Sequence, residues 1–216
     1  MNYFAEKTAF INFSSIFCKM DKDNQILEIF HQNKGYARTK DVLEAGVHHH
    51  YLDMLVQKGK VVKIKRGLYR LVSVSVDDEL EEVSYIVPDG VVCLFSAWNF
   101  YQLSDFVPPE YHIAIEKTHK VALPDYPPIK IYYWSEKYWS IGISEVRIGN
   151  TIVKIYDKEK SVCDAIRFRN KVGLDVMKEV LKNYLALRDR NLNDLMSFAK
   201  QIRISTIARK YLEILV

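Results

Sequence analysis

The side chains best able to do chemistry are concentrated between Lys34 and Val72. This stretch holds nine Lys or Arg against three Asp or Glu, a net charge of +6, whereas the whole 216-residue chain carries only +4. Among these cations stand His, Asp and Gln side chains, whose donors and acceptors complement the edges of nucleic-acid bases. A stretch of this kind could bind a polyanion by charge and read it by hydrogen bonding.

The polar side chains share one face of an expected helix, Val47 to Lys58. At 100° per residue the apolar residues of this segment fall broadly on one side, which predicts packing against a core. The other side carries His49, His50, Asp53 and Gln57. Gln can pair with adenine, Asp can accept from cytosine N4, and His can donate to guanine. A basic helical face that is merely solvated remains the alternative.

Short elements around this helix must position these groups. Thr39 to Ala45 predicts a short helix with Thr39 as N-cap, and Gly46 ends it in the left-handed conformation. After the second helix and Gly59, Val61 to Lys65 and Leu68 to Val72 predict a hairpin that turns at Arg66-Gly67. Helix, turn, helix and basic hairpin is the pattern of a winged helix-turn-helix, a DNA-binding module that also occurs as a protein-binding one.

An earlier helix completes the module. Asp23 is expected as its N-cap, followed by an apolar stripe that ends at Phe30. We therefore predict an N-terminal extension over residues 1–20, the winged helix-turn-helix over residues 21–73, and a second domain over residues 77–216.

Residues 77–216 predict an α+β fold. About four strands, at residues 111–116, 129–134, 142–148 and 151–156, favour an antiparallel sheet, with a hairpin at Gly149-Asn150. Ser96 is expected to cap a short aromatic helix that ends at Leu103. Asp157 is expected to cap the first of several helices that form a C-terminal helical bundle.

Composition narrows the classes of protein. The three cysteines lie far apart and form no Cys-x-x-Cys pair, so neither a zinc ribbon nor a disulfide framework is indicated. No apolar run is long enough to span a bilayer, and no signal peptide is recognised. We expect a cytoplasmic protein without membrane contact. Charge is segregated: residues 1–72 carry +5, residues 73–156 carry −6, and residues 157–216 carry +5.

Enzyme and metal motifs are not found. His48-His49-His50 cannot converge on one ion from a helix, because adjacent residues point 100° apart. Asp157 and Glu159 lack the spacing of a nuclease acid before a Lys, and Asp164 is expected in an intrahelical ion pair with Lys160 or Arg167. We therefore assign no catalytic residue, no metal and no cofactor.

Two segments together resemble the AbiEi antitoxin family of type IV toxin-antitoxin and abortive-infection systems. One is the wing, Arg66-Gly67-Leu68-Tyr69-Arg70, and the other runs from Tyr156 to Asp164 in the pattern Tyr-Asp-x-Glu-Lys-x-x-x-Asp. A Ser-Ala helix beginning at Ser96 is also similar. The resemblance covers about Asp23 to the end. The family often has Arg where Lys160 stands here.

The resemblance implies a function for each domain. The N-terminal domain would bind operator DNA and repress its own operon. The second domain would counter a co-encoded nucleotidyltransferase toxin, without needing to contact it, as part of phage defence. A homodimer stays open. The candidate DNA-binding residues are Thr39, Lys40, His48, His49, His50, Asp53 and Gln57 toward the groove, and Lys63, Lys65 and Arg66 toward phosphates.

Two other classes of function stay open. One is a protein-binding adaptor, whose winged helix would recruit a partner and whose behaviour would be insensitive to salt. The other is an enzyme in the second domain, which a convergent acidic site at Asp157, Glu159 and Asp164 would favour.

Overall fold

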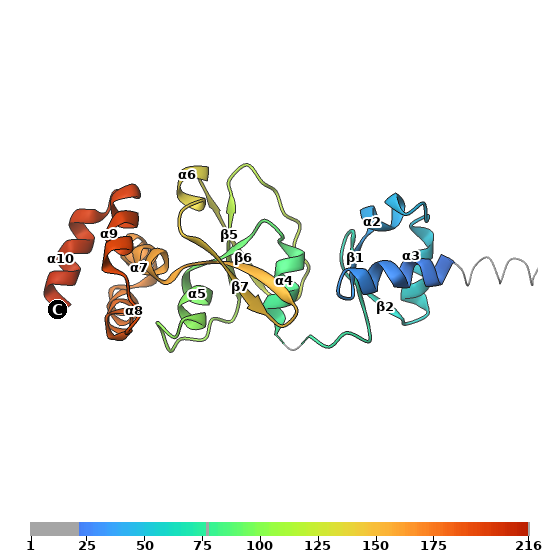
Figure 1. Ribbon diagram of the computed structural model, residues 1–216, viewed down its shortest axis with the longest axis horizontal. Coiled ribbons are helices and arrows are strands. Elements are labelled where there is room, and N and C mark those ends of the chain that lie inside the picture. The colour runs from blue at the N-terminus through green and yellow to red at the C-terminus, as the bar shows by residue number, and fades with distance from the viewer. Residues whose placement is uncertain (1–21, 77, 216) are drawn as a thin grey trace, which may run out of the picture. The chain divides into compact units, whose positions relative to one another are not determined.

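The chain divides into two compact units, residues 1–76 and residues 77–216. The computed structural model describes residues 22–76 and 78–215, and Figure 1 shows the elements of both units. The expected extension over residues 1–20 lies outside the described residues. Each unit is described below by itself.

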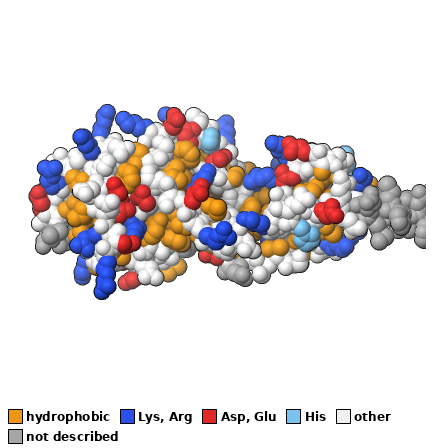
Figure 2. All heavy atoms as spheres, viewed as in Figure 1, with side chains coloured by type: hydrophobic (Ala, Val, Ile, Leu, Met, Phe, Trp, Pro, Cys, Tyr) orange, Lys and Arg blue, Asp and Glu red, His pale blue; other side chains and the backbone are white. Residues whose placement is uncertain are grey.

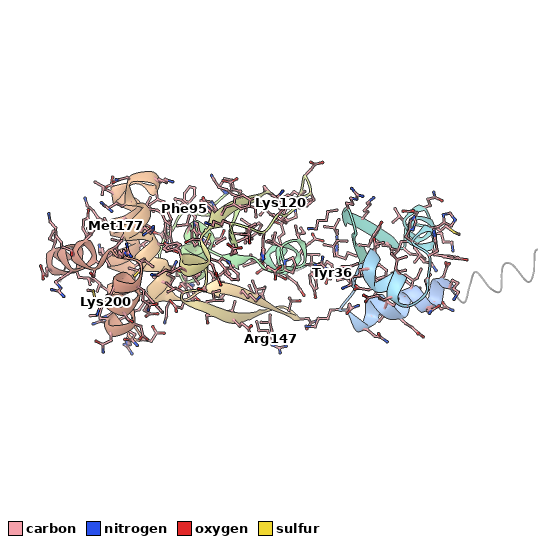
Figure 3. All side chains as sticks on the ribbon, turned by 90° about the horizontal axis from the view of Figure 1, so that it is seen from above. Tyr36, Phe95, Lys120, Arg147, Met177 and Lys200 are labelled. Carbon is pink, nitrogen blue, oxygen red and sulfur yellow. The ribbon has the colours of Figure 1, made fainter. Side chains whose placement is uncertain are left out.

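The N-terminal unit is a winged helix-turn-helix, as predicted. Residues 22–32 are helical. The further elements are β1 (Tyr36–Arg38), α2 (Thr39–Glu44), α3 (His50–Gln57), β2 (Val61–Lys65) and β3 (Leu68–Leu71). The three strands form an antiparallel sheet in the order β1-β3-β2. Strand β1, which carries Tyr36 (labelled in Figure 3), was not expected, since three residues give too short a pattern to recognise.

The core of this unit follows the apolar periodicity. Ile26 and Phe30 of the first helix, Val42 of α2, and Leu52 and Leu55 of α3 are fully buried and form one cluster. Gly46 adopts the left-handed conformation at φ 73° and separates α2 from α3, as expected. The phase of α3 is therefore set by packing, and its opposite face is left to solvent.

Three helix starts in this unit differ from the prediction. Thr39 is the first residue of α2 rather than its N-cap; Arg38 holds that position, and its backbone N–H donates to Asp41 Oδ2 at 2.8 Å. Asp23 lies within the first helix, where it is buried and ion-paired to Lys58. Helix α3 begins at His50 instead of Val47. For Asp23 a tertiary contact decides the role of a residue that local propensity would make a cap.

The C-terminal unit is a mixed α+β domain. Its first part contains α4 (Glu79–Ile86), β4 (Val91–Val92), α5 (Leu94–Phe100), β5 (Tyr111–Glu116), β6 (Ile129–Trp134) and α6 (Glu136–Trp139). The hairpin β7 (Ile143–Ile148) and β8 (Thr151–Tyr156) follows, as predicted, and leads into α7 (Lys158–Val172), α8 (Leu174–Ala186), α9 (Leu192–Gln201) and α10 (Ser205–Leu215).

The sheet of this unit is mixed, so the expectation of an antiparallel sheet is wrong. Its five strands run in the order β6-β5-β4-β8-β7. Strand β4 pairs antiparallel with β5 but parallel with β8, and β5 pairs parallel with β6. A connection over residues 117–128 is long enough to return the chain to the same end of the sheet, which a parallel pair requires. Strand β4 is only two residues long, too short to be recognised as central.

The helices of this unit complete the core. Helices α8 and α9 pack against α7, and α7 to α10 gather at one end of the domain (Figure 1). Ser96 is not a cap: it lies inside α5, is buried, and its Oγ accepts a hydrogen bond from the backbone N–H of His112 at 2.8 Å. Asp157 caps α7 as expected, accepting from the N–H of Lys160 at 2.7 Å. No helix among the described residues combines the length and apolarity needed to cross a bilayer.

Candidate DNA interface

The outer face of α3 carries polar side chains that take no part in the core. His50, Asp53 and Gln57 are exposed on it, one turn apart or nearly so. Leu52 and Leu55 hold the opposite face to the core. Histidine side chains are visible at the surface of this unit in Figure 2. An exposed row of donors and acceptors on the second helix of a helix-turn-helix is the arrangement that reads base edges in the major groove.

The three consecutive histidines mark the start of this helix. His48 precedes it and His49 is its N-cap, so only His50 belongs to the helix itself. The backbone N–H of His50 donates to His48 Nδ1 at 3.2 Å, and the rings of His48 and His49 lie 4.2 Å apart. All three are exposed. Within residues 22–76 and 78–215, no three His, Cys, Asp or Glu side chains are arranged to hold a metal ion.

The wing separates its two predicted lysines. A bulge lies between Lys63 and Lys65, so that Lys63 opposes Tyr69 while Lys65 opposes Leu68. Since Tyr69 and Leu68 are adjacent in β3, the two lysines point to opposite faces of the hairpin. Lys63 and the turn residue Arg66 are exposed, whereas Lys65 is half-buried. Simple alternation along β2 would have placed both lysines on one face.

Lys65 has a neighbour that the sequence did not single out. Arg38 of β1 and Lys65 of β2 both oppose Leu68 of β3, so their side chains share one face of the sheet. Burial, and then the charge of Arg38, lower the pKa of Lys65 below its usual value. Arg38 ends β1 immediately before α2, and only the sheet register could have shown that it lies near the wing.

The start of α2 lies beside the wing turn. The backbone N–H of Thr39 donates to the carbonyl of Gly67 at 3.1 Å. Thr39 is half-buried at this junction, and Lys40 projects into solvent, where it lies 3.6 Å from Glu44. The two groove-facing candidates on α2 thus begin close to the turn that carries Arg66, a phosphate-binding candidate.

Other cations of the basic segment have structural roles. Lys58 is ion-paired to the buried carboxylate of Asp23. Arg70 Nη1 donates to the carbonyl of Val74 at 2.9 Å and thereby holds the chain that leaves the wing. The net charge of the segment therefore overstates the number of cations directed at a ligand.

The acidic residues of the second domain do not converge. Asp157 caps α7, Glu159 accepts from Tyr184 Oη at 2.9 Å, and Asp164 pairs with Lys160. Burial, partly offset by the bond from the Lys160 N–H, raises the pKa of Asp157 to about 6. Each carboxylate serves its own structural contact, so the convergent acidic site that would favour an enzyme is not formed by these three residues.

The expected ion pair on α7 is confirmed, and it is buried completely. Lys160 Nζ lies 2.6 Å from Asp164 Oδ1, and both side chains have no exposed surface. Tyr138 Oη also donates to Asp164. The ammonium lies over the rings of Tyr138, Tyr156 and Trp134 at 4.0, 4.2 and 4.9 Å. The pair holds α7 to the aromatic core between the sheet and α6.

Comparison with known proteins supports the family resemblance in the N-terminal unit. Residues 24–72 match the family model described as "Transcriptional regulator, AbiEi antitoxin". No curated protein matches the chain. A similar solved structure is the crystal structure of RV2827C protein from Mycobacterium tuberculosis, 11% identical, covering 89% of this chain and 81% of that chain with a TM-score of 0.45. A likeness at that TM-score decides nothing about function. The resemblance to the AbiEi family of transcriptional regulators and antitoxins is thus confirmed over residues 24–72.

Proposed function

We propose that this protein is a DNA-binding autorepressor and the antitoxin of a type IV toxin-antitoxin system, acting in the cytoplasm as part of phage defence. One observation carries the DNA-binding part of the proposal. The exposed face of α3 presents His50, Asp53 and Gln57 beside a wing whose Lys63 and Arg66 are directed into solvent. Polar groups aligned on a recognition helix and flanked by cations complement a major groove bounded by phosphates.

Docking follows from this geometry. With α3 in the major groove, Gln57 and Asp53 face base edges, and His48 to His50 enter at the helix N-terminus, the end of a recognition helix that usually contacts bases. Lys63 and Arg66 of the wing contact the phosphates of the DNA backbone, and Lys40 at the start of α2 faces the edge of the groove. Phosphate contacts fix the register, and the α3 side chains select the sequence.

The antitoxin part of the proposal rests on the family match. The matched family is described as an antitoxin as well as a transcriptional regulator. The resemblance implies a co-encoded nucleotidyltransferase toxin that the second domain counters without a required contact. We assign no catalytic role to the second domain, because Asp157, Glu159 and Asp164 are each committed to a structural contact.

The test is a polarisation titration of the full chain against DNA from upstream of its own gene, beside scrambled DNA of equal length, at two salt concentrations. Tight binding to the upstream DNA over the scrambled DNA is expected, with affinity falling steeply as salt rises. Equal binding to both would contradict autorepression. No binding at low salt would overturn the DNA interface and favour a protein-binding adaptor. If the chain binds as a homodimer, a footprint should show two half-sites about 34 Å apart.

A further inference from the structure

The second domain contains a cavity whose lining differs in character from the DNA interface. It has a volume of about 620 Å³ and lies between β6, the start of α5 and the C-terminal half of α7. Phe95 of α5, which contributes to its wall, is labelled in Figure 3. A cavity of this size is within the range that holds a small organic ligand.

Aromatic side chains form much of the wall. Trp134 and Phe168 stack with their ring centres 5.7 Å apart and their planes 15° from parallel. Tyr132 stacks on His112 at 5.5 Å, and its hydroxyl is hydrogen-bonded to His112 Nδ1 at 2.8 Å. The ring of Phe95 lies 5.2 Å from that of His112, with the two planes tilted by 58°. These contacts hold the rings in place, which makes the wall a ready platform for a flat ring.

The charged side chains of the wall are all cations. Lys130, Arg167 and Lys171 line the cavity, and no Asp or Glu does. Lys130 is paired with Glu110 at 2.8 Å, whereas no salt bridge is found for Arg167 or Lys171 among the described residues. This concentration of positive charge adjoins a sheet-rich region, residues 73–156, whose net charge is −6. The charge of the lining therefore favours an anionic ligand.

Two contacts hold the Arg167 guanidinium at the wall of the cavity. Its Nη1 donates to the carbonyl of Ile202 at 3.0 Å, and its guanidinium lies 4.6 Å from the centre of the Tyr138 ring. A second cavity of about 270 Å³ shares Ser135, Tyr138 and Arg167 with the first and adds Lys137 and Arg203 to the lining, again without an acid. Arg167 thus stands at the junction of an aromatic compartment and a smaller cationic one.

We propose that these two neighbouring cavities, which share Ser135, Tyr138 and Arg167, bind a nucleotide unit. Its base would stack in the aromatic compartment near Phe168 and Tyr132, and its phosphates would contact Arg167 and Lys171 and extend toward Arg203. A planar aromatic ring joined to phosphate is the chemistry that matches stacked rings beside unpaired cations. The unit could be a free nucleotide or the end of a single strand. This proposal does not depend on the winged helix binding DNA.

The test uses the full chain and calorimetric titration with five probes: ATP, UTP, uridine, inorganic tripolyphosphate and 5′-phosphorylated tetrauridylate. At least one nucleoside triphosphate is expected to bind roughly tenfold or more tightly than uridine and tripolyphosphate, because only the nucleotide uses both compartments. Tighter binding of tetrauridylate than of either mononucleotide would identify a strand end as the ligand. The reverse order would identify a free nucleotide.

Matched variants locate the site. Lys171→Gln and Arg167→Gln are expected to weaken nucleotide binding roughly tenfold, while Lys182→Gln, an exposed lysine of α8 outside both cavities, leaves it unchanged. The wing variant Lys63→Gln/Arg66→Gln should also leave it unchanged, which excludes the N-terminal unit as the binding site. Lys171 is exposed and its ammonium lies 5.9 Å from the centre of the Phe168 ring, a weak contact, so the Lys171→Gln variant is expected to fold normally. Absence of binding near 1 mM, equal binding of tripolyphosphate, or wild-type affinity in Lys171→Gln would each overturn the proposal.

Discussion

At the scale of single residues, Gln57 is an exposed side chain that is a candidate for base recognition. It lies on the outer face of α3, at the end away from the histidines, and no core contact constrains its choice. A glutamine in that position can donate to and accept from one adenine at once. Under the proposed function, this glutamine would serve to read a base rather than to support the fold.

Gln57→Ala should change which operator sequences are bound. The expected loss of discrimination at one base position is about 1–3 kcal/mol, with little change in the salt dependence. The measurement is competition polarisation against operator variants substituted one base pair at a time. The control is Gln32→Ala, an exposed glutamine of the first helix. A uniform loss of affinity on all sequences would show that Gln57 does not contact a base.

Unlike Gln57, Lys160 and Asp164 form a buried ion pair, and we expect the pair to affect the stability of the fold. Both side chains are fully buried, and the Asp164 carboxyl, whose pKa burial raises, depends on the ammonium and on Tyr138 for compensation. Removing either partner leaves a buried group without its counter-charge. This lowers the free energy of unfolding far more than replacing both partners with apolar side chains does.

Lys160→Met should reduce the free energy of unfolding of the second domain by about 3–5 kcal/mol. The double variant Lys160→Met/Asp164→Leu should recover part of this loss, because no unpaired carboxyl remains. Urea denaturation of the three proteins measures both effects. A single variant as stable as the wild type would mean that the pair does not hold α7 to the sheet.

His112 gives the second domain a dependence on pH. Burial is the main reason that its pKa falls from 6.5 to about 4. At this residue the folded protein therefore binds fewer protons than the unfolded chain between those values, so the contribution of His112 to stability is lost as the pH falls from 6.5 toward 4. From pH 7 to pH 5 this single group should remove roughly 2 kcal/mol from the free energy of unfolding.

His112→Gln should flatten this part of the stability profile, and His119→Gln, an exposed histidine, should not. Denaturation curves at pH 7 and pH 5 test the difference between the two variants. An equal loss on acidification in wild type and His112→Gln would assign the effect to other groups.

At the scale of elements, the wing shows how one irregularity changes a surface. The bulge between Lys63 and Lys65 turns these side chains to opposite faces of the hairpin. Lys63 and Arg66 then form the exposed edge, while Lys65 lies with Arg38 near the start of α2. The wing consequently has two places where a phosphate could be held.

Lys63→Gln and Arg66→Gln should each weaken DNA binding on all sequences alike. Each should reduce the slope of log affinity against log salt by about one, since each removes one phosphate contact. Titrations at several salt concentrations test this, with the exposed Lys120 of the second domain as the control position for a Lys→Gln change. A Lys65 variant that changed sequence preference without changing the slope would show that the wing does not serve phosphates.

At the scale of the whole molecule, the two units have separate cores. One cluster contains Ile26, Phe30 and Leu55 and draws only on the first unit, and the other contains Trp98, Tyr156 and Leu181 and draws only on the second. Each unit can therefore hold its own fold.

Thermal unfolding of the full chain should show two transitions. Lys160→Met should lower only the transition of the second unit, because the ion pair belongs to that core. Tryptophan fluorescence follows the second unit selectively, since Trp98, Trp134 and Trp139 all lie in it. A single transition that moves as a whole in the variant would contradict independent cores.

The sequence by itself determined the elements whose signals are local. Apolar periodicity placed the faces of α3, Gly59 marked its end, and the turns at Arg66-Gly67 and Gly149-Asn150 specified two hairpins. Charge concentration in residues 34–72 indicated the basic module, and a spacing of four residues gave the Lys160–Asp164 pair. Such features depend on neighbours within one or two turns of chain, which a sequence states directly.

Only the tertiary structure decided the features that depend on distant pairing. The two-residue strand β4 joins β5 to β8 and makes the sheet mixed, a bulge separates Lys63 from Lys65, and Arg38 reaches Lys65 across β3. Ser96 and Asp23 were expected to cap helices, but their side chains accept hydrogen bonds from His112 and Lys58, which are 16 and 35 residues away. The cavity at Arg167 combines α5, β6 and α7 in the same way. Long-range packing outweighs local propensity at these positions, because burying a polar group requires whichever partner the fold brings to it.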